Sequence, residues 1–260
     1  MKKLYFILLL FTVSLTSLAQ DEVVVAINEE TVTKAQADSA YINNDFASAI
    51  SIYETILQNE GESADIYYNL GNSYYKMENI AKAILNYEKA LLLNPGNGDI
   101  RFNLELANSK TVDKVVPMSE MFFVTWVRSL TNSLSEKGWG KVGITTFLVT
   151  LIGLLLYFFG KKIILKKIGF IAAIAFFFIC IIANVFASIQ KTEAMNHSNA
   201  IIMVPSITVK STPNEGGTDL FILHEGRKVM IKDNTMKEWK EIQLEDGNVG
   251  WVPVSAIEII

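Results

Sequence analysis

The residue types that usually carry catalysis are scarce in this chain. The two histidines, His197 and His224, have no metal-binding partner nearby in the sequence. The single cysteine, Cys180, lies inside a long apolar run. In such a run, a cysteine is more often a small packing residue than a redox-active thiol. No G-x-S-x-G, H-E-x-x-H or phosphate-binding loop occurs. We therefore expect no catalytic site, no metal and no cofactor. An active site whose residues come together only in the folded chain is the least favoured of the functional hypotheses.

Residues suited to binding a partner gather between residues 31 and 110. The unit Ala64–Pro95 places apolar or small residues at helical spacing and ends in proline. Gly71 and Ala83 are small where two paired helices would approach closely. A weaker copy lies about 34 residues earlier, and residues 99–110 resemble one more first helix, which would cap the stack.

The weaker copy repeats both core positions and caps. Its core residues Ala37, Ala49 and Tyr53 correspond to Gly71, Ala83 and Tyr87 of the stronger unit. We expect three side chains to cap helix N-termini, namely Asp45, Ser63 and Asn79.

These units resemble the tetratricopeptide repeat (TPR), a helix-turn-helix motif whose stacked first helices line a groove for peptides or proteins. The resemblance implies that the groove is lined by Lys34, Asp38, Tyr41, Tyr68, Asn69, Asn72, Tyr75 and Phe102. One TPR subgroup grips a C-terminal carboxylate, but Asp38 replaces an expected Asn here, and Asp99 and Asn103 replace expected cations. The alternative is that the tyrosines are core aromatics at helical spacing.

Two apolar runs without charged residues predict a membrane hairpin at residues 142–160 and 168–189. A helix of about 18 residues spans about 27 Å, close to the hydrocarbon thickness of a bilayer. The connecting loop, residues 161–167, carries the four lysines Lys161, Lys162, Lys166 and Lys167. Short basic loops stay cytoplasmic, so both ends of the mature chain are expected in the periplasm.

The chain begins with a segment typical of export. Residues 1–19 combine two lysines, an apolar centre and small residues before Ala19, and predict a cleaved signal peptide. An uncleaved anchor is the alternative and leaves the topology unchanged. Residues 20–30 form a lead-in segment without a further assignment.

Residues 111–141 link the repeats to the first span. Apolar residues gather on one face of the segment that contains Trp126, and Trp139 follows shortly before the span. Trp and amphipathic helices favour the membrane–water boundary, so we expect an interfacial helix. The alternative is a longer helix buried against the repeats.

After a polar linker at residues 190–199, residues 200–260 change to short β-rich runs separated by turns. Asp246-Gly247 predicts a hairpin turn. The T-V-K-S start at Thr208, the L-H-E-G turn at Leu223 and the G-W ending at Trp251 resemble the bacterial SH3 (SH3b) domain. The resemblance implies an SH3-like barrel that binds cell-wall peptides or proteins, with Trp239 as the candidate ligand contact.

The order of the expected segments along the chain, from the signal peptide to the SH3b domain, resembles that of the BatE family of the Bacteroides aerotolerance (Bat) operon. That resemblance rests on Y-Y-N-L-G-N-S-Y-Y-K, on the following R-F-N-L-E-L-A-N-S-K and on the G-W-ended β segment. It implies an inner-membrane location beside von Willebrand factor A domain proteins and a role in oxidative-stress tolerance.

We therefore expect a multi-domain membrane protein with an all-α TPR region, two transmembrane helices and an all-β SH3-like barrel. The expected function is a scaffold that binds partner proteins in the periplasm. The alternative is a sensor or anchor that binds peptidoglycan through the SH3b domain. The net charge of −4 argues against a nucleic-acid partner.

Overall fold

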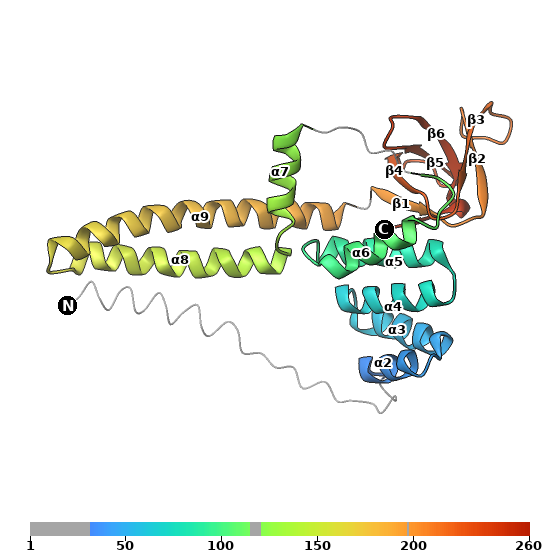
Figure 1. Ribbon diagram of the computed structural model, residues 1–260. Helices are drawn as coiled ribbons and strands as arrows, with labels where there is room; N and C mark the ends of the chain where they lie inside the picture. The colour runs from blue at the N-terminus through green and yellow to red at the C-terminus, as the bar shows by residue number, and fades with distance from the viewer. Residues whose placement is uncertain (1–31, 115–120, 197) are drawn as a thin grey trace. The chain divides into compact units, whose positions relative to one another are not determined.

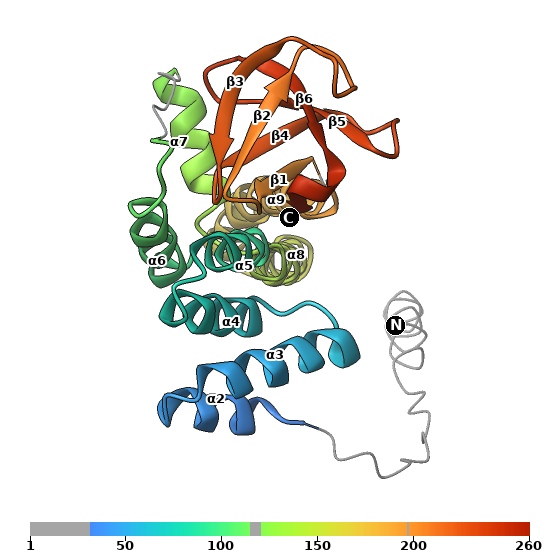
Figure 2. The ribbon, with the colours of Figure 1, turned by 90° about the vertical axis from the view of Figure 1, so that its right-hand side faces the viewer.

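The computed structural model describes residues 32–114, 121–196 and 198–260. The expected signal peptide and lead-in segment lie outside these residues. The first part is a stack of helices, which follow one another as antiparallel neighbours (Figure 2). They are α2 (Lys34–Ile42), α3 (Phe46–Glu60), α4 (Ala64–Lys76), α5 (Ile80–Leu93) and α6 (Gly98–Asn108).

The two helix pairs share one turn geometry. Asn44 and Glu78 both have positive φ, 61° and 60°, directly before the capping residues. The Asp45 side chain accepts from Ser48 N and Asn79 accepts from Lys82 N, which confirms both expected caps. Ser63 occupies the N-cap position of α4, but its side chain makes no capping hydrogen bond there.

The repeat core is built from the residues that recur between the two copies. Ala37, Ala49 and Ala83 are fully buried, and Tyr53 and Tyr87 are 1% exposed. At Gly71 a Cβ atom would lie 2.7 Å from the ring of Tyr87, so this position needs glycine for close packing.

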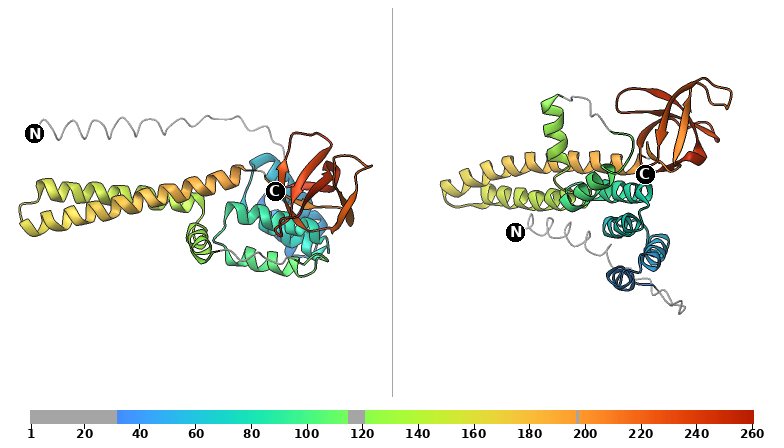
Figure 3. Two further views of the ribbon diagram at one scale, coloured as in Figure 1. Left: turned by 90° about the horizontal axis from the view of Figure 1, so that it is seen from above. Right: turned by 45° about the vertical axis from the view of Figure 1, so that its right-hand side comes forward.

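Three helices follow, namely α7 (Phe122–Thr131), α8 (Glu136–Phe159) and α9 (Ile163–Met195). Helices α8 and α9 are each long and apolar enough to cross a membrane. They run side by side as an antiparallel pair (Figures 1 and 3). The turn between them is shorter than expected, because residues 163–167 continue the helical pattern and form the first turns of α9.

Small residues allow the backbones of α8 and α9 to approach closely. A Cβ atom at Gly153 would lie 2.8 Å from the carbonyl oxygen of Gly169, and one at Gly169 would lie 2.6 Å from that of Gly153. Close backbone approach through small residues is the usual way in which helices pack in lipid. Nearer the start of α8, Gly143 faces the side chain of Asn184.

The last part is a seven-stranded antiparallel sheet with the order β3-β2-β6-β5-β4-β1-β7. Its strands are β1 (Asn199–Ile202), β2 (Ser206–Lys210), β3 (Asp219–His224), β4 (Lys228–Asp233), β5 (Trp239–Gln243), β6 (Val249–Pro253) and β7 (Ile257–Ile259). The short helix η2 (Val254–Ala256) precedes β7.

The expected SH3-like barrel is wrong in that the sheet does not close into a barrel, because β3 and β7 remain its two edges. Pairing of sequence neighbours is correctly anticipated, since Asp246 and Gly247 lie in the turn that joins β5 to β6. A series of short strands specifies such local pairs but not whether the first and last strands meet.

The sheet packs on the repeats through β1. Successive strand residues point to opposite faces, and here both faces are covered. Ile201 is buried in the core of the repeats, whereas Ile202 is buried in the core of the sheet. Gly226, with φ +82°, lies so close to α5 that a Cβ atom there would meet Ile84 at 3.0 Å.

Polar contacts reinforce this junction. The carboxylate of Asp113 accepts from the backbone N–H of His224 at 2.7 Å and lies 2.9 Å from the Nδ1 atom of the same residue. On α5, Glu88 forms an ion pair of 2.7 Å with Lys228. The sheet therefore covers a side of α5 that α4 and α6 leave open.

Candidate functional site

The first helices α2, α4 and α6 carry polar side chains that hydrogen-bond in two groups, one between α2 and α4 and one between α4 and α6. We call Asp38, Asn69, Asn72 and Asn103 the polar ladder. At one end, Asp38 accepts from Lys34 Nζ at 2.7 Å and from Asn69 Nδ2 at 3.2 Å. The hydroxyl of Tyr53, which reaches through from α3, donates to the same carboxylate at 2.5 Å.

The other end of the ladder joins α4 to α6. Asn72 Oδ1 accepts from the hydroxyl of Tyr87 at 2.8 Å and from Asn103 Nδ2 at 2.9 Å. Asn103 Nδ2 also donates to the hydroxyl of Tyr68 at 3.0 Å. Because each amide is held by a neighbouring helix, the ladder presents fixed rather than freely rotating polar groups.

The three tyrosines of the expected groove are half-buried and pack against the repeat core. Tyr41 meets Phe46 edge to face, with ring centroids 5.3 Å apart. Lys110 Nζ lies 4.3 Å from the ring centroid of Tyr75, a cation–π geometry. These rings therefore contribute to packing as well as to the surface.

Phe102 differs from the tyrosines because 64% of its surface is exposed. Leu106, one helical turn later on α6, is also exposed. This apolar pair lies beside Asn103 along the helix, so it adjoins the polar ladder. An exposed Phe–Leu pair next to fixed hydrogen-bonding groups is a suitable anchor point for another protein.

The electrostatics of the ladder centre on Asp38. Burial by itself would raise the pKa of Asp38, but hydrogen bonds from Lys34, Tyr53 and Asn69 outweigh it and lower the pKa below its usual value. The pKa of Tyr53 is raised, first by burial and then by the adjacent Asp38 carboxylate. Asp38 is thus an ionised acceptor and Tyr53 a neutral donor at neutral pH.

This arrangement predicts an acid-sensitive ladder. A carboxylate whose pKa is lower in the folded state stabilises the fold above its unfolded pKa, and this contribution is lost as pH falls through the folded pKa. We expect Asp38→Asn to destabilise the repeats at neutral pH, with the difference from wild type shrinking below about pH 4. Thermal unfolding followed by circular dichroism across pH checks this, with Glu60→Gln as a control for loss of one surface charge. A difference that stays constant down to pH 2 would contradict it.

The same contacts disfavour a carboxylate clamp. Lys34 keeps the position of a clamp cation, but its charge is paired with Asp38. An incoming C-terminal carboxylate would have to displace that ion pair and would face the negative charge of Asp38.

The expected groove set did not include the ladder residue Asn103, nor Tyr53 and Tyr87, whose hydroxyls donate to the ladder. The two tyrosines recur at equivalent positions of α3 and α5, which identified them as core, and their rings are indeed buried. Their hydroxyls reach between the first helices, a long-range contact that helical spacing cannot reveal. Trp239 lies on β5, half-buried and paired with Pro253 of β6, outside the ladder.

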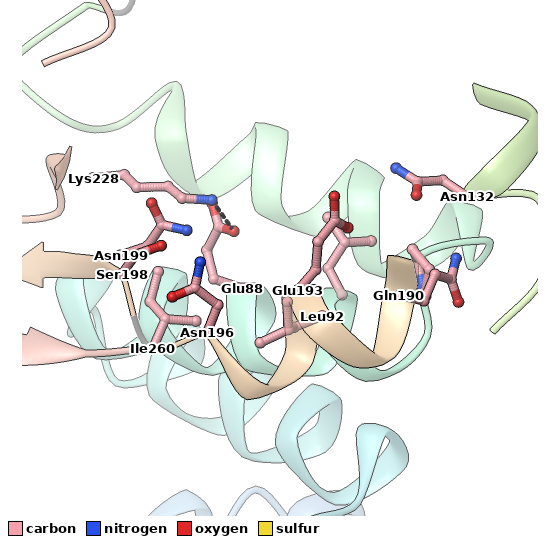
Figure 4. A pocket seen from close by; sticks show the side chains of 12 residues that line it. Glu88, Leu92, Asn132, Gln190, Glu193, Asn196, Ser198, Asn199, Lys228 and Ile260 are labelled. Atoms are coloured by element: carbon pink, nitrogen blue, oxygen red, sulfur yellow. Dashed lines mark hydrogen bonds and ion pairs between the residues drawn. The ribbon is translucent and has the colours of Figure 1, made fainter. Parts of the chain in front are cut away.

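A separate polar cavity of about 290 Å³ lies where α5, the end of α9 and β1 meet (Figure 4). The Glu88–Lys228 ion pair lies at one side, and Gln190 and Asn132 lie at the other. Gln190 Nε2 donates to the carbonyl of Thr131, whereas its Oε1 has no hydrogen-bond partner among the described residues. This cavity belongs to the junction between the repeats, the second long helix and the sheet.

Among the described residues, no group of three or more His, Cys, Asp or Glu side chains is arranged to hold a metal ion. Cys180 lies in α9 with its Sγ atom 3.4 Å from the carbonyl oxygen of Gly143 on α8. Its surroundings are the contact between the two long helices.

Comparison with known proteins identifies the repeat. Residues 64–97 match the family model of the tetratricopeptide repeat, which covers α4, α5 and the Asn97 cap of α6. A comparison with curated proteins finds no match for the chain. The protein thus combines a tetratricopeptide repeat, a motif that suggests protein–protein interaction, with two helices long enough to span a membrane and an open antiparallel sheet.

Proposed function

We propose that this protein is a membrane-anchored adaptor that binds a partner protein at the first-helix face of its repeats. The observation that carries the proposal is the polar ladder beside the exposed Phe102–Leu106 pair, within a stack that contains a tetratricopeptide repeat. Fixed polar groups next to an open aromatic side chain lower the entropy cost of binding. The role is one of recognition rather than catalysis.

The ladder also defines the kind of partner. Its exposed groups are amides, hydroxyls and an ion pair of zero net charge, so they suit a neutral polar segment with an apolar side chain for Phe102. Anchoring to a membrane raises the effective concentration of partners in the same bilayer, so a weak single contact suffices. The resemblance to Bat proteins offers von Willebrand factor A domain membrane proteins in the inner membrane as candidates.

The test is site-specific photo-crosslinking in cells. We expect a photoreactive residue in place of Phe102 to capture a partner, and one in place of Gln58, an exposed residue of α3, to capture little. Phe102→Ala should weaken binding of the captured protein roughly tenfold or more. Equal capture from both positions would contradict the assignment of this face. Capture of nothing, together with sedimentation of the protein with peptidoglycan that depends on Trp239, would favour the cell-wall anchor instead.

The adaptor proposal also implies which side of the membrane each part of the chain faces. Lys161 and Lys162 lie in the turn between α8 and α9, so this turn should be cytoplasmic and the repeats should be periplasmic. In a Cys180→Ser background, we expect Gln58→Cys to react with a membrane-impermeant maleimide in intact cells. Lys161→Cys should react only after lysis. The opposite pattern would place the repeats in the cytoplasm and rule out a periplasmic adaptor.

A further inference from the structure

Helix α7 carries a row of apolar side chains that the described protein leaves uncovered. Phe122 is 86% exposed and Trp126 66%, and Leu130 completes the row at intervals of four residues. Thr131 is the one buried residue of the helix. At about 100° per residue, the apolar residues of α7 occupy one broad side of the helix, and Thr125 and Arg128 fall on the remaining side, so α7 has an apolar and a polar face.

Hydrogen bonds hold the end of α7 against the two long helices. The carbonyl oxygen of Thr131, at the end of α7, accepts from Trp139 Nε1 on α8 at 2.8 Å and from Gln190 Nε2 on α9 at 2.7 Å. Both donors lie at the ends of α8 and α9 that are far in sequence from their connecting turn. The end of α7 is therefore held beside the open end of the hairpin.

An apolar cavity of about 310 Å³ separates α7 from α9. Phe123, Val124 and Val127 line it from α7, and Ile189 lines it from α9. Polar side chains, among them Asn132 and Glu193, also line it. A space lined by both apolar and polar groups matches the boundary between acyl chains and headgroups.

We propose that membrane lipid covers this surface: α7 lies in the plane of the bilayer surface, and an acyl chain enters the cavity between α7 and α9. The inference rests on the proposed membrane position of the hairpin. Lipid is favoured over a protein partner because α7 is hydrogen-bonded, at Thr131, to two helices whose apolar side chains are exposed in the same way. A tryptophan on a short amphipathic helix beside a span is typical of the interface.

The test uses spin labels on the full chain in phospholipid nanodiscs, with Cys180→Ser as background. Labels are placed singly by Leu130→Cys on the apolar face, Thr125→Cys on the polar face, Val127→Cys at the cavity and Phe178→Cys on α9. Collisions with oxygen report lipid, and collisions with a water-soluble nickel complex report water. We expect labels at 130 and 127 to favour oxygen over nickel severalfold relative to the label at 125.

The label on α9 separates the two proposals. A lipid signal at 178 with a water signal at 130 would overturn the α7 inference and leave the membrane anchor intact. A water signal at 178 would overturn both. A label at 130 that is shielded from both reagents would show that protein, either this chain or a second copy, covers α7, and would also overturn the inference. A water signal at 127 would contradict the presence of an acyl chain in the cavity.

Discussion

Replacing Ile201 with alanine is expected to destabilise the repeats, although this residue belongs to the sheet. Its side chain is fully buried in the repeat core, so truncation should leave a cavity there and cost about 2–5 kcal/mol of the free energy of unfolding. Hydrogen–deuterium exchange read by mass spectrometry should show faster exchange in α5 than in the wild type. The strands β5 and β6 should change less.

The neighbouring residue provides the matched control. Ile202 is equally buried, but its side chain enters the core of the sheet. Ile202→Ala should therefore accelerate exchange in the sheet more than in α5. If both variants accelerate exchange in the same elements, β1 does not separate two cores in the way described.

Replacing Gly153 with valine is expected to disrupt the contact between α8 and α9. The new side chain would collide with the backbone of Gly169 and Ala173, which cannot move aside as a flexible side chain could. Overpacking of this kind costs about 1–3 kcal/mol or more. Unfolding of the protein in mixed micelles with increasing dodecyl sulfate should reveal the loss.

Gly140 lies on the same helix and has open space where a Cβ atom would be added. Gly140→Val makes the same chemical change, and we expect its effect to stay within about 0.5 kcal/mol. Equal losses in the two variants would show that glycine itself, rather than the helix contact at Gly153, determines stability.

Much of the helical part could be predicted from local patterns. The recurrence of Ala49, Tyr53 and Asp45 one repeat before Ala83, Tyr87 and Asn79 fixed both helix pairs, because small residues and caps have strict positional requirements. The junction with the sheet could not be predicted. The run Ala200–Ile202 lacks alternation, which indicates burial on both faces of a strand, but it does not say what covers each face.

The candidate face could be predicted only in part. Repeat spacing placed Lys34, Asp38, Asn69 and Asn72 on the first helices, where the structure also has them. It did not predict that these groups bond to one another, because the bonds cross between helices and include hydroxyls from α3 and α5. Whether this face binds a partner is a proposal that the crosslinking experiment tests.

The position of Ile201 has a consequence for the order in which the protein assembles. The ribosome makes the repeats first, then the two long helices, and only afterwards the strand that carries Ile201. Until then, Ile84 on α5 also lacks the contact that the β3–β4 connection later makes at Gly226. Because exposed apolar surface on an incomplete domain invites aggregation, the repeats should need chaperone protection until the segment after the hairpin is synthesised.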